Sequence, residues 1–203
     1  MSKRRLLVAP IAATLALTLA ACGSDDDTSS ADTTPAAATD PAGEQGAVVL
    51  NDADVEFAQG MIAHHEQAIE MSEIALDPNR SAGPEVIDLA TRIQAAQEPE
   101  IEQMTAWLTA AGEPLTMDMS EGHDMSDMEG MMTAEQMDAL AAATGADFDQ
   151  MWLEMMIAHH EGAISQSETV KANGSNPDVL ALADQIITAQ QAEIAEMQAL
   201  LES

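Results

Sequence analysis

The chain has 203 residues, a formal net charge of −30 and one cysteine. Its six basic residues are few against 36 acidic ones, so the sequence predicts no nucleic-acid partner and favours cations, although acidity also keeps an exported protein soluble. Because one cysteine allows neither an internal disulfide nor a thiolate-rich zinc or iron–sulfur site, a metal would need His, Met, Asp or Glu ligands.

The first residues, 1–21, are predicted to be a signal peptide. Three basic side chains at positions 3–5 precede an uncharged apolar stretch over 6–19, which is short for a membrane span. The stretch ends in Leu-Ala-Ala-Cys, which resembles the lipobox of bacterial lipoproteins. We therefore expect lipid on Cys22 and a place in the cell envelope, at the outer face of the cytoplasmic membrane or in the periplasm. The alternative is an ordinary secreted protein with a chance cysteine.

The segment after the lipobox, residues 22–50, is predicted to be a tether. Residues 23–46 are rich in Asp, Ser, Thr, Ala and Pro and lack apolar periodicity, so they cannot bury enough surface to fold. The folded domain is expected over residues 51–203, a length that suits a single domain.

The expected domain contains an internal repeat. Residues 54–73 match 149–168, and each copy contains Met-Ile-Ala-His-His-Glu. A second pair of matching segments follows, at 84–104 and 177–197, after short loops of different length. Each half therefore predicts one helix, a turn and a second helix.

The spacing of apolar residues supports these helices. Steps of three and four residues join the members of each seam, which is a helical period and not a strand alternation. The seam of the first helix is Phe57, Met61, His64, Ala68, Met71 and Ala75, and that of its repeat is Trp152, Met156, His159, Ala163, Gln166 and Val170.

The helix ends are predicted from capping residues. Asp52 and Asp147 are expected N-caps, and Pro84 and Pro177 suit the first turn of a helix. Two helical hairpins with short loops predict an all-α fold, an antiparallel four-helix bundle.

The connection between the halves is rich in methionine. Residues 133–143 are expected to form a short helix capped by Thr133, with Gln136 three residues on. The loop before it, 114–132, has too much Gly, Asp and Ser for a core element. It carries Met117, Met119, His123, Met125 and Met128, followed by Met131 and Met132. We interpret it as a metal-capturing segment; the alternative is a surface loop that docks apolar side chains onto the bundle.

The histidine pairs are the strongest functional motif. A buried imidazole needs a partner, and folding alone does not explain why both halves place two histidines on a helix seam. Methionines three and four residues earlier share their face, and the hairpin register brings a Gln, a Glu and a Met of the second helix opposite. The candidate ligands are Met61, His64, His65, Glu100 and Met104, and in the second half Met156, His159, His160, Glu193 and Met197, with Gln97 and Gln190 nearby.

This set of residue types indicates copper. Thioether and imidazole favour copper, above all Cu(I), over iron, magnesium or calcium, while another divalent metal stays open. Four glutamates leave room for a harder ion or for support of the imidazoles: Glu66, Glu161, Glu100 and Glu193. The repeat predicts either two equivalent sites or one shared site on the pseudo-twofold axis.

These motifs resemble a known family. The stretches "GMIAHHEQAIEMSE", "MMTAEQMDALAAATGADFD" and "LEMMIAHHEGAI" are similar to the secreted bacterial proteins of domain of unknown function 305, over residues 52–201. The resemblance implies a ferritin-like four-helix bundle and, as for some members, copper binding and resistance. Gln166 departs from the repeat, because it stands where the first half has Met71. The second site is therefore expected to have fewer thioethers.

The sequence thus predicts an envelope-anchored lipoprotein that binds copper, as Cu(I), for sequestration, resistance or delivery. A ferritin-like metal oxidase is one alternative, although a Glu-x-x-His motif and tyrosine are missing from the chain. A second alternative is an interaction or structural lipoprotein without metal, whose histidines pack or titrate near pH 6. No enzymatic reaction is assigned, and a homo-oligomer whose bundles share a site stays open.

Overall fold

The repeated segments form the four long helices of the structure. The computed structural model describes residues 48–117 and 128–203, and the long helices are α1 (Asp52–Leu76), α2 (Pro84–Ala111), α4 (Ala146–Asn173) and α5 (Pro177–Leu201). A short helix, α3 (Ala134–Ala142), and one 3-10 turn, η1 (Pro78–Arg80), complete the elements. No strand occurs in the described residues, so the all-α prediction is confirmed.

Several predicted features lie outside the described residues. They are the signal peptide, the lipid attachment at Cys22, the tether up to residue 47, and the loop residues Met119, His123 and Met125. The end of the predicted tether, in contrast, contacts the domain. The carbonyl of Val49 accepts a hydrogen bond from Asn176, and Leu50 packs against the apolar core.

The helix ends confirm some capping predictions and correct others. Pro84 and Pro177 occupy first-turn positions, and Thr133 forms a capping box with Gln136, as predicted. The predictions of Asp52 and Asp147 as N-caps are wrong. The actual cap of α1 is Asn51, because its side chain accepts from the Asp54 amide while the Asp54 carboxylate accepts from the Asn51 amide. The cap of α4 is Gly145, at a φ of 62°.

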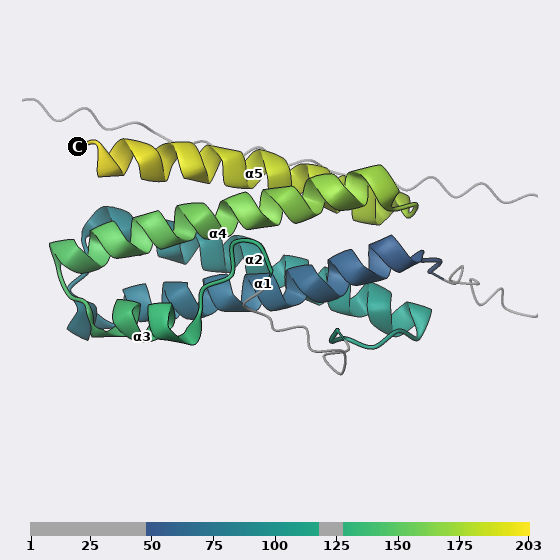
Figure 1. Ribbon diagram of the computed structural model, residues 1–203, viewed down its shortest axis with the longest axis horizontal. Helices are drawn as coiled ribbons and strands as arrows, with labels where there is room; N and C mark the ends of the chain where they lie inside the picture. The colour runs from purple at the N-terminus through teal and green to yellow at the C-terminus, as the bar shows by residue number, and fades with distance from the viewer. Residues whose placement is uncertain (1–47, 118–127) are drawn as a thin grey trace, which may run out of the picture. The chain divides into compact units, whose positions relative to one another are not determined.

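The two hairpins, α1–α2 and α4–α5, pack mainly through α1 and α4 (Figure 1). The two inner helices are antiparallel, since the start of α1 lies beside the end of α4 and Trp152 near the start of α4 donates to the carbonyl of Met71. Consequently α2 ends at one end of the bundle and α4 begins at the other. The connection between them, which contains α3, must run back along the bundle, as in ferritin-like folds.

Each hairpin holds the turn of the other with one aspartate. Asp54 of α1 is fully buried, and its carboxylate accepts from the amides of Ser175 and Asn176 at 3.0 and 3.1 Å and from the Ser175 hydroxyl. Asp149, the equivalent residue of α4, accepts twice from the amide of Gly83, at 2.9 and 3.0 Å. These reciprocal contacts fix the register in which α1 and α4 meet.

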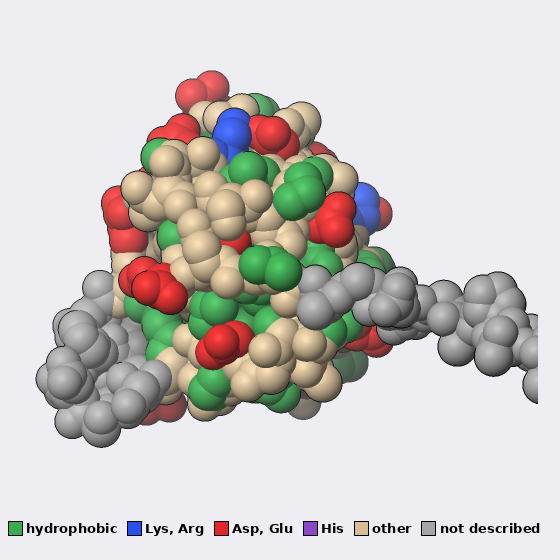
Figure 2. Space-filling view, turned by 90° about the vertical axis from the view of Figure 1, so that its right-hand side faces the viewer, with side chains coloured by type: hydrophobic (Ala, Val, Ile, Leu, Met, Phe, Trp, Pro, Cys, Tyr) green, Lys and Arg blue, Asp and Glu red, His purple; other side chains and the backbone are tan. Residues whose placement is uncertain are grey.

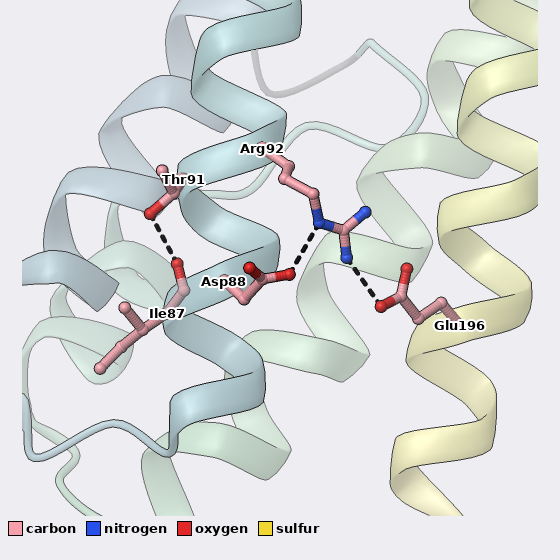
Figure 3. Close-up of polar contacts among 5 residues, drawn as sticks. All are labelled: Ile87, Asp88, Thr91, Arg92 and Glu196. Atoms are coloured by element: carbon pink, nitrogen blue, oxygen red, sulfur yellow. Dashed lines mark hydrogen bonds and ion pairs between the residues drawn. The ribbon is translucent and has the colours of Figure 1, made fainter. Parts of the chain in front are cut away.

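The outer helices are joined by an exposed ion-pair network. Arg92 of α2 donates to Asp88 on its own helix at 2.8 Å and to Glu196 of α5 at 2.7 Å (Figure 3). Acidic side chains are scattered over the face shown in Figure 2, while blue Lys and Arg side chains are sparse there. Among the described residues, no helix combines the length and apolar character needed to cross a membrane.

Candidate metal centre

The four histidines of the repeat meet in the middle of the bundle. The rings of His64 and His159 lie 3.8 Å apart between centroids, at an angle of 42°. His160 lies beside His159, with ring centroids 6.4 Å apart, and all four imidazoles are at most 1% exposed. We call His64, His65, His159 and His160 the histidine layer. The two halves therefore bring their histidine faces together in one layer, which favours a shared site over two separate ones.

Apolar clusters lie on either side of the histidine layer. One combines the start of α1 with the end of α4, and it includes Met61 and Met104. The other combines the end of α1 with the start of α4, and it includes Met156 and Met197. All four methionines are completely buried. A polar layer enclosed between two apolar clusters excludes bulk water, and each cluster contributes two thioether side chains from the repeat positions.

The nitrogen atoms of the layer are largely without partners. Both nitrogens of His64 and of His159, and the Nδ1 atoms of His65 and His160, are buried without a hydrogen bond. A buried polar group that stays unpaired costs roughly 1–3 kcal/mol, so six such atoms in one layer are unusual for a core that serves folding alone. Neutral imidazole and thioether are a donor set that suits a soft metal ion, and these residues therefore fit copper.

Two glutamates reach the layer from the outer helices. His65 Nε2 lies 2.7 Å from Glu100 Oε2, and His160 Nε2 lies 2.8 Å from Glu193 Oε2. Both pairs agree with the hairpin register expected from the sequence. Glu66 and Glu161, adjacent to the histidine pairs along the chain, are exposed on the opposite face.

Burial keeps the central imidazoles neutral. Desolvation is the largest cause that lowers the pKa of His64 to about 3, and repulsion from His65 and His160 comes next. The main chain of Glu129 raises this pKa, but it does not meet the geometry of a hydrogen bond to His64. Burial, followed by the charges of the other three histidines, lowers the pKa of His159 well below its usual value. Both side chains therefore present nitrogen lone pairs over the physiological pH range.

The crossover connection covers one side of the layer. We call residues 128–132 the strap. It is tied to α1 by Gln67, whose side chain donates to the carbonyl of Met132 at 2.9 Å and accepts from its amide at 2.7 Å. It lies against α4 at Gly162, where an added Cβ would be 2.7 Å from Gly130 Cα and closer still to the Glu129 carbonyl oxygen.

The described methionines of the Met-rich loop lie in two different surroundings. Met132 is buried in the apolar core, as the docking alternative predicts. Met117 and Met128 instead line a side cavity of about 380 Å³ between α1 and α4, together with Glu56, Gly60 and Gln166. Glu129 also lines this cavity, so the cavity and the histidine layer share the strap as a wall.

The structure therefore separates the predicted ligands that it describes into two groups. The layer and its borders bring together His64, His65, His159, His160, Met61, Met104, Met156, Met197, Glu100 and Glu193. Met117 and Met128 lie apart from the layer, in the side cavity. Within residues 48–117 and 128–203, no three His, Cys, Asp or Glu side chains already converge as a complete metal site, so thioethers or small side-chain movements are needed to complete one.

Two residues that hold the strap were not predicted from the sequence. They are Gln67 and Gly162, which occupy equivalent positions of the repeat and contact the strap in different ways. The replacement of Gln by Gly inside a helix was the available sign that another main chain approaches there. Met71, compared above with Gln166, belongs to the apolar core beyond Met156, and Gln166 Nε2 is buried without a partner.

The comparisons with known proteins agree with this architecture. A family model described as "Domain of unknown function (DUF305)" matches residues 54–201, and the chain belongs to this family. A DUF305 protein from Streptomyces coelicolor is 30% identical, with a TM-score of 0.67 over 74% of this chain and 92% of that one. A DUF305 fragment from Deinococcus radiodurans is 31% identical, with a TM-score of 0.67 over 75% and 97%. No curated protein matches the sequence.

A third similar structure is described as a copper-bound form. CopM in its Cu(II)-bound form is 35% identical, with a TM-score of 0.62 over 73% of this chain and 95% of that one. CopM has also been solved in Cu(I)-bound and silver-bound forms. The family of this chain therefore includes a structure with bound copper.

Proposed function

We propose that this chain is an envelope-anchored lipoprotein that binds copper as Cu(I) and sequesters it, protects against it or delivers it. The ion would be held by imidazoles of the histidine layer together with the bordering thioethers of Met61, Met104, Met156 and Met197. Copper would be the cargo, and the chain's own contribution is a buried set of imidazole and thioether donors in the centre of the bundle.

One observation carries this proposal. Six imidazole nitrogens of the histidine layer are buried and unpartnered, and four buried methionines border the same layer. If the layer served packing alone, apolar side chains at these positions would avoid the cost of the unpaired nitrogens. A bound soft cation satisfies several of the nitrogens at once and turns this cost into ligation.

The relatives support the metal class. CopM, about a third identical in sequence, was solved with Cu(II), Cu(I) and silver. Silver and Cu(I) are both soft monovalent ions, so their binding by a relative fits a site built from imidazole and thioether.

Export and anchoring rest on the sequence. The basic, apolar N-terminus and the Leu-Ala-Ala-Cys motif support lipid on Cys22. The similar protein from Streptomyces coelicolor is described as secreted. A Cys22→Ser variant should move the chain from the membrane fraction of its host to the soluble fraction. Equal membrane association of both chains would contradict the anchor.

The metal proposal is tested by titrating Cu(I) against a competing chelator. We expect tight binding by the wild-type chain and its loss in a variant with alanine at His64, His65, His159 and His160. A Met61→Leu/Met156→Leu double variant keeps the side-chain volume and should bind Cu(I) more weakly without losing helicity. Binding that survives all these changes would move the site to the Met-rich loop. No competitive binding by the wild-type chain would contradict the proposal.

The lowered pKa of His64 disfavours one form of the alternative without metal, in which this histidine titrates near pH 6 inside the folded bundle. A pKa of about 3 for His64 keeps this side chain neutral in the folded bundle at pH 6. Protonation there would have to follow unfolding rather than trigger it. Metal binding is therefore the function that the layer supports best.

A further inference from the structure

Two hydrogen bonds connect the histidine layer to the protein surface, one in each hairpin. His65 Nε2 is 2.7 Å from Glu100 Oε2 and His160 Nε2 is 2.8 Å from Glu193 Oε2. The histidine side chains are 0% exposed, while the glutamates are 20% and 16% exposed. Each glutamate therefore lies between solvent and a buried imidazole, and the arrangement occurs twice around the pseudo-twofold axis.

These contacts determine where the imidazole protons sit. With an ionised carboxylate, which only accepts hydrogen bonds, Nε2 is the atom that donates in both pairs. A neutral imidazole has one N–H group, and its second nitrogen then keeps a lone pair. That second nitrogen is Nδ1, which in His65 and in His160 is buried and has no partner.

We infer that Glu100 and Glu193 are positioning residues that fix the tautomer of His65 and His160, so that Nδ1 of each is the atom that binds the metal ion. This inference rests on the proposed function and assigns different roles within the predicted ligand set. The two glutamates act through the imidazoles and do not ligate the ion themselves. Carboxylate support of this kind orients the ring and raises the basicity of its ligating nitrogen.

The inference also separates the histidines into two kinds. No described side chain forms a hydrogen bond with either nitrogen of His64 or of His159, so no carboxylate selects their tautomer. His65 and His160 are prepared for binding before an ion arrives. The two carboxylates also place negative charge one hydrogen bond away from the ligating rings, which offsets the cost of a cation in a fully buried layer.

The test compares a substitution at each of the two glutamates with a charge-matched control at a nearby exposed glutamate. Glu100→Gln and Glu193→Gln keep the shape of the side chain but offer an amide that can donate to Nε2 and release the tautomer. Glu66→Gln and Glu161→Gln remove the same charge next to the same histidines, from side chains that point to solvent. All four variants are made in the full chain.

Two readouts are measured on these variants. In the metal-free chain with ¹⁵N-labelled histidine, nitrogen chemical shifts should show protonated Nε2 and unprotonated Nδ1 for His65 and His160. Glu100→Gln should change this pattern at His65 only, and Glu193→Gln at His160 only. Competition titrations should show that Cu(I) affinity falls by about 10- to 100-fold in these two variants and by less than about threefold in the controls.

The outcomes separate the inference from the proposed function. A wild-type chain with protonated Nδ1 at His65 and His160, or Glu→Gln variants that bind Cu(I) like the controls, would overturn the inference alone. A wild-type chain that binds no Cu(I) would overturn the proposed function, and the tautomer measurement on the metal-free chain would still decide the role of the glutamates. Circular dichroism of each variant confirms that lost affinity does not reflect a lost fold.

Discussion

The two hairpins present the same histidine face but hold the crossover connection in different ways. On α1, Gln67 binds the strap through its side chain. On α4, the equivalent Gly162 lets the main chain of Glu129 and Gly130 lie directly against the helix. The repeat therefore supplies the two halves of the histidine layer, whereas the departures from the repeat seat the single segment that covers it.

The largest expected effect is the pH dependence of stability, which tests whether His64 and His159 contribute to it equally. The folded-state pKa of His64 and of His159 lies below the unfolded value of 6.5, so the unfolded chain binds more protons and stability falls as pH drops below 6.5. For His64 this continues towards pH 3. Between pH 6.5 and 5, His64 alone should remove on the order of 2 kcal/mol of unfolding free energy, and His159 should add to this loss in the same direction.

The check is urea unfolding of the metal-free chain at several pH values. His64→Leu and His159→Leu should each reduce the pH dependence by about half, because each removes one of the two buried bases. If one variant removes the whole dependence and the other none, the two halves of the layer are not equivalent.

The aspartates that hold the opposite turns provide the second test. Asp54→Ala leaves the buried amides of Ser175 and Asn176 without an acceptor and should cost between about 2 and 3 kcal/mol. Asp149→Ala should cost about 1 kcal/mol, since the partly exposed Asp149 binds the single amide of Gly83. Chemical denaturation compares the two variants, and a larger loss for Asp149→Ala would reverse the expected order.

The glycines near the strap provide the third test. Gly162→Ala forces a methyl group against the main chain of Glu129 and should cost between about 1 and 2 kcal/mol. Gly60→Ala meets only the ends of two side chains, with Gln166 Oε1 at 3.2 Å and Met128 Cε at 3.6 Å, and should cost less. Hydrogen exchange of residues 128–132 should accelerate in Gly162→Ala. Unchanged exchange there would show that the strap does not depend on this contact.

The smallest expected effect concerns the exposed contact between the outer helices. Arg92→Ala removes the ion pairs with Asp88 and Glu196, but exposed pairs of this kind contribute less than about 1 kcal/mol each. Thermal unfolding should shift by only a few degrees, and the shift should shrink further at high salt. A large destabilisation would mean that this contact between α2 and α5 contributes more to stability than an exposed ion pair is expected to.

Local patterns in the sequence were sufficient to predict most of the fold. The three-and-four spacing around His64 and His159, and prolines 84 and 177, anticipated the four long helices, and Thr133 with Gln136 anticipated α3. The caps at Asn51 and Gly145 were missed because neighbouring aspartates offer equally good capping chemistry. The buried role of Asp54 was also missed, since its partners lie more than 100 residues away along the chain.

The candidate site was predictable within each hairpin and ambiguous between hairpins. Register alone places Glu100 near His65 and Glu193 near His160, because a short turn fixes which residues of two helices face each other. The meeting of His64 with His159 depends on how the hairpins pack, and the sequence left one shared site and two separate sites equally open. The path of the strap past Gly162 likewise depends on tertiary contacts.

X-ray absorption spectroscopy of the chain loaded with Cu(I) would test the central claim most directly. We expect one class of copper with both nitrogen and sulfur neighbours, because the imidazoles of the layer and the thioethers at its borders are buried together. Any Cu(I) that the variant without the four repeat histidines still takes up at high concentration should have no nitrogen neighbours. Copper with only sulfur neighbours in the wild-type chain would show that the imidazoles of the layer do not bind the ion, and this result would contradict the account.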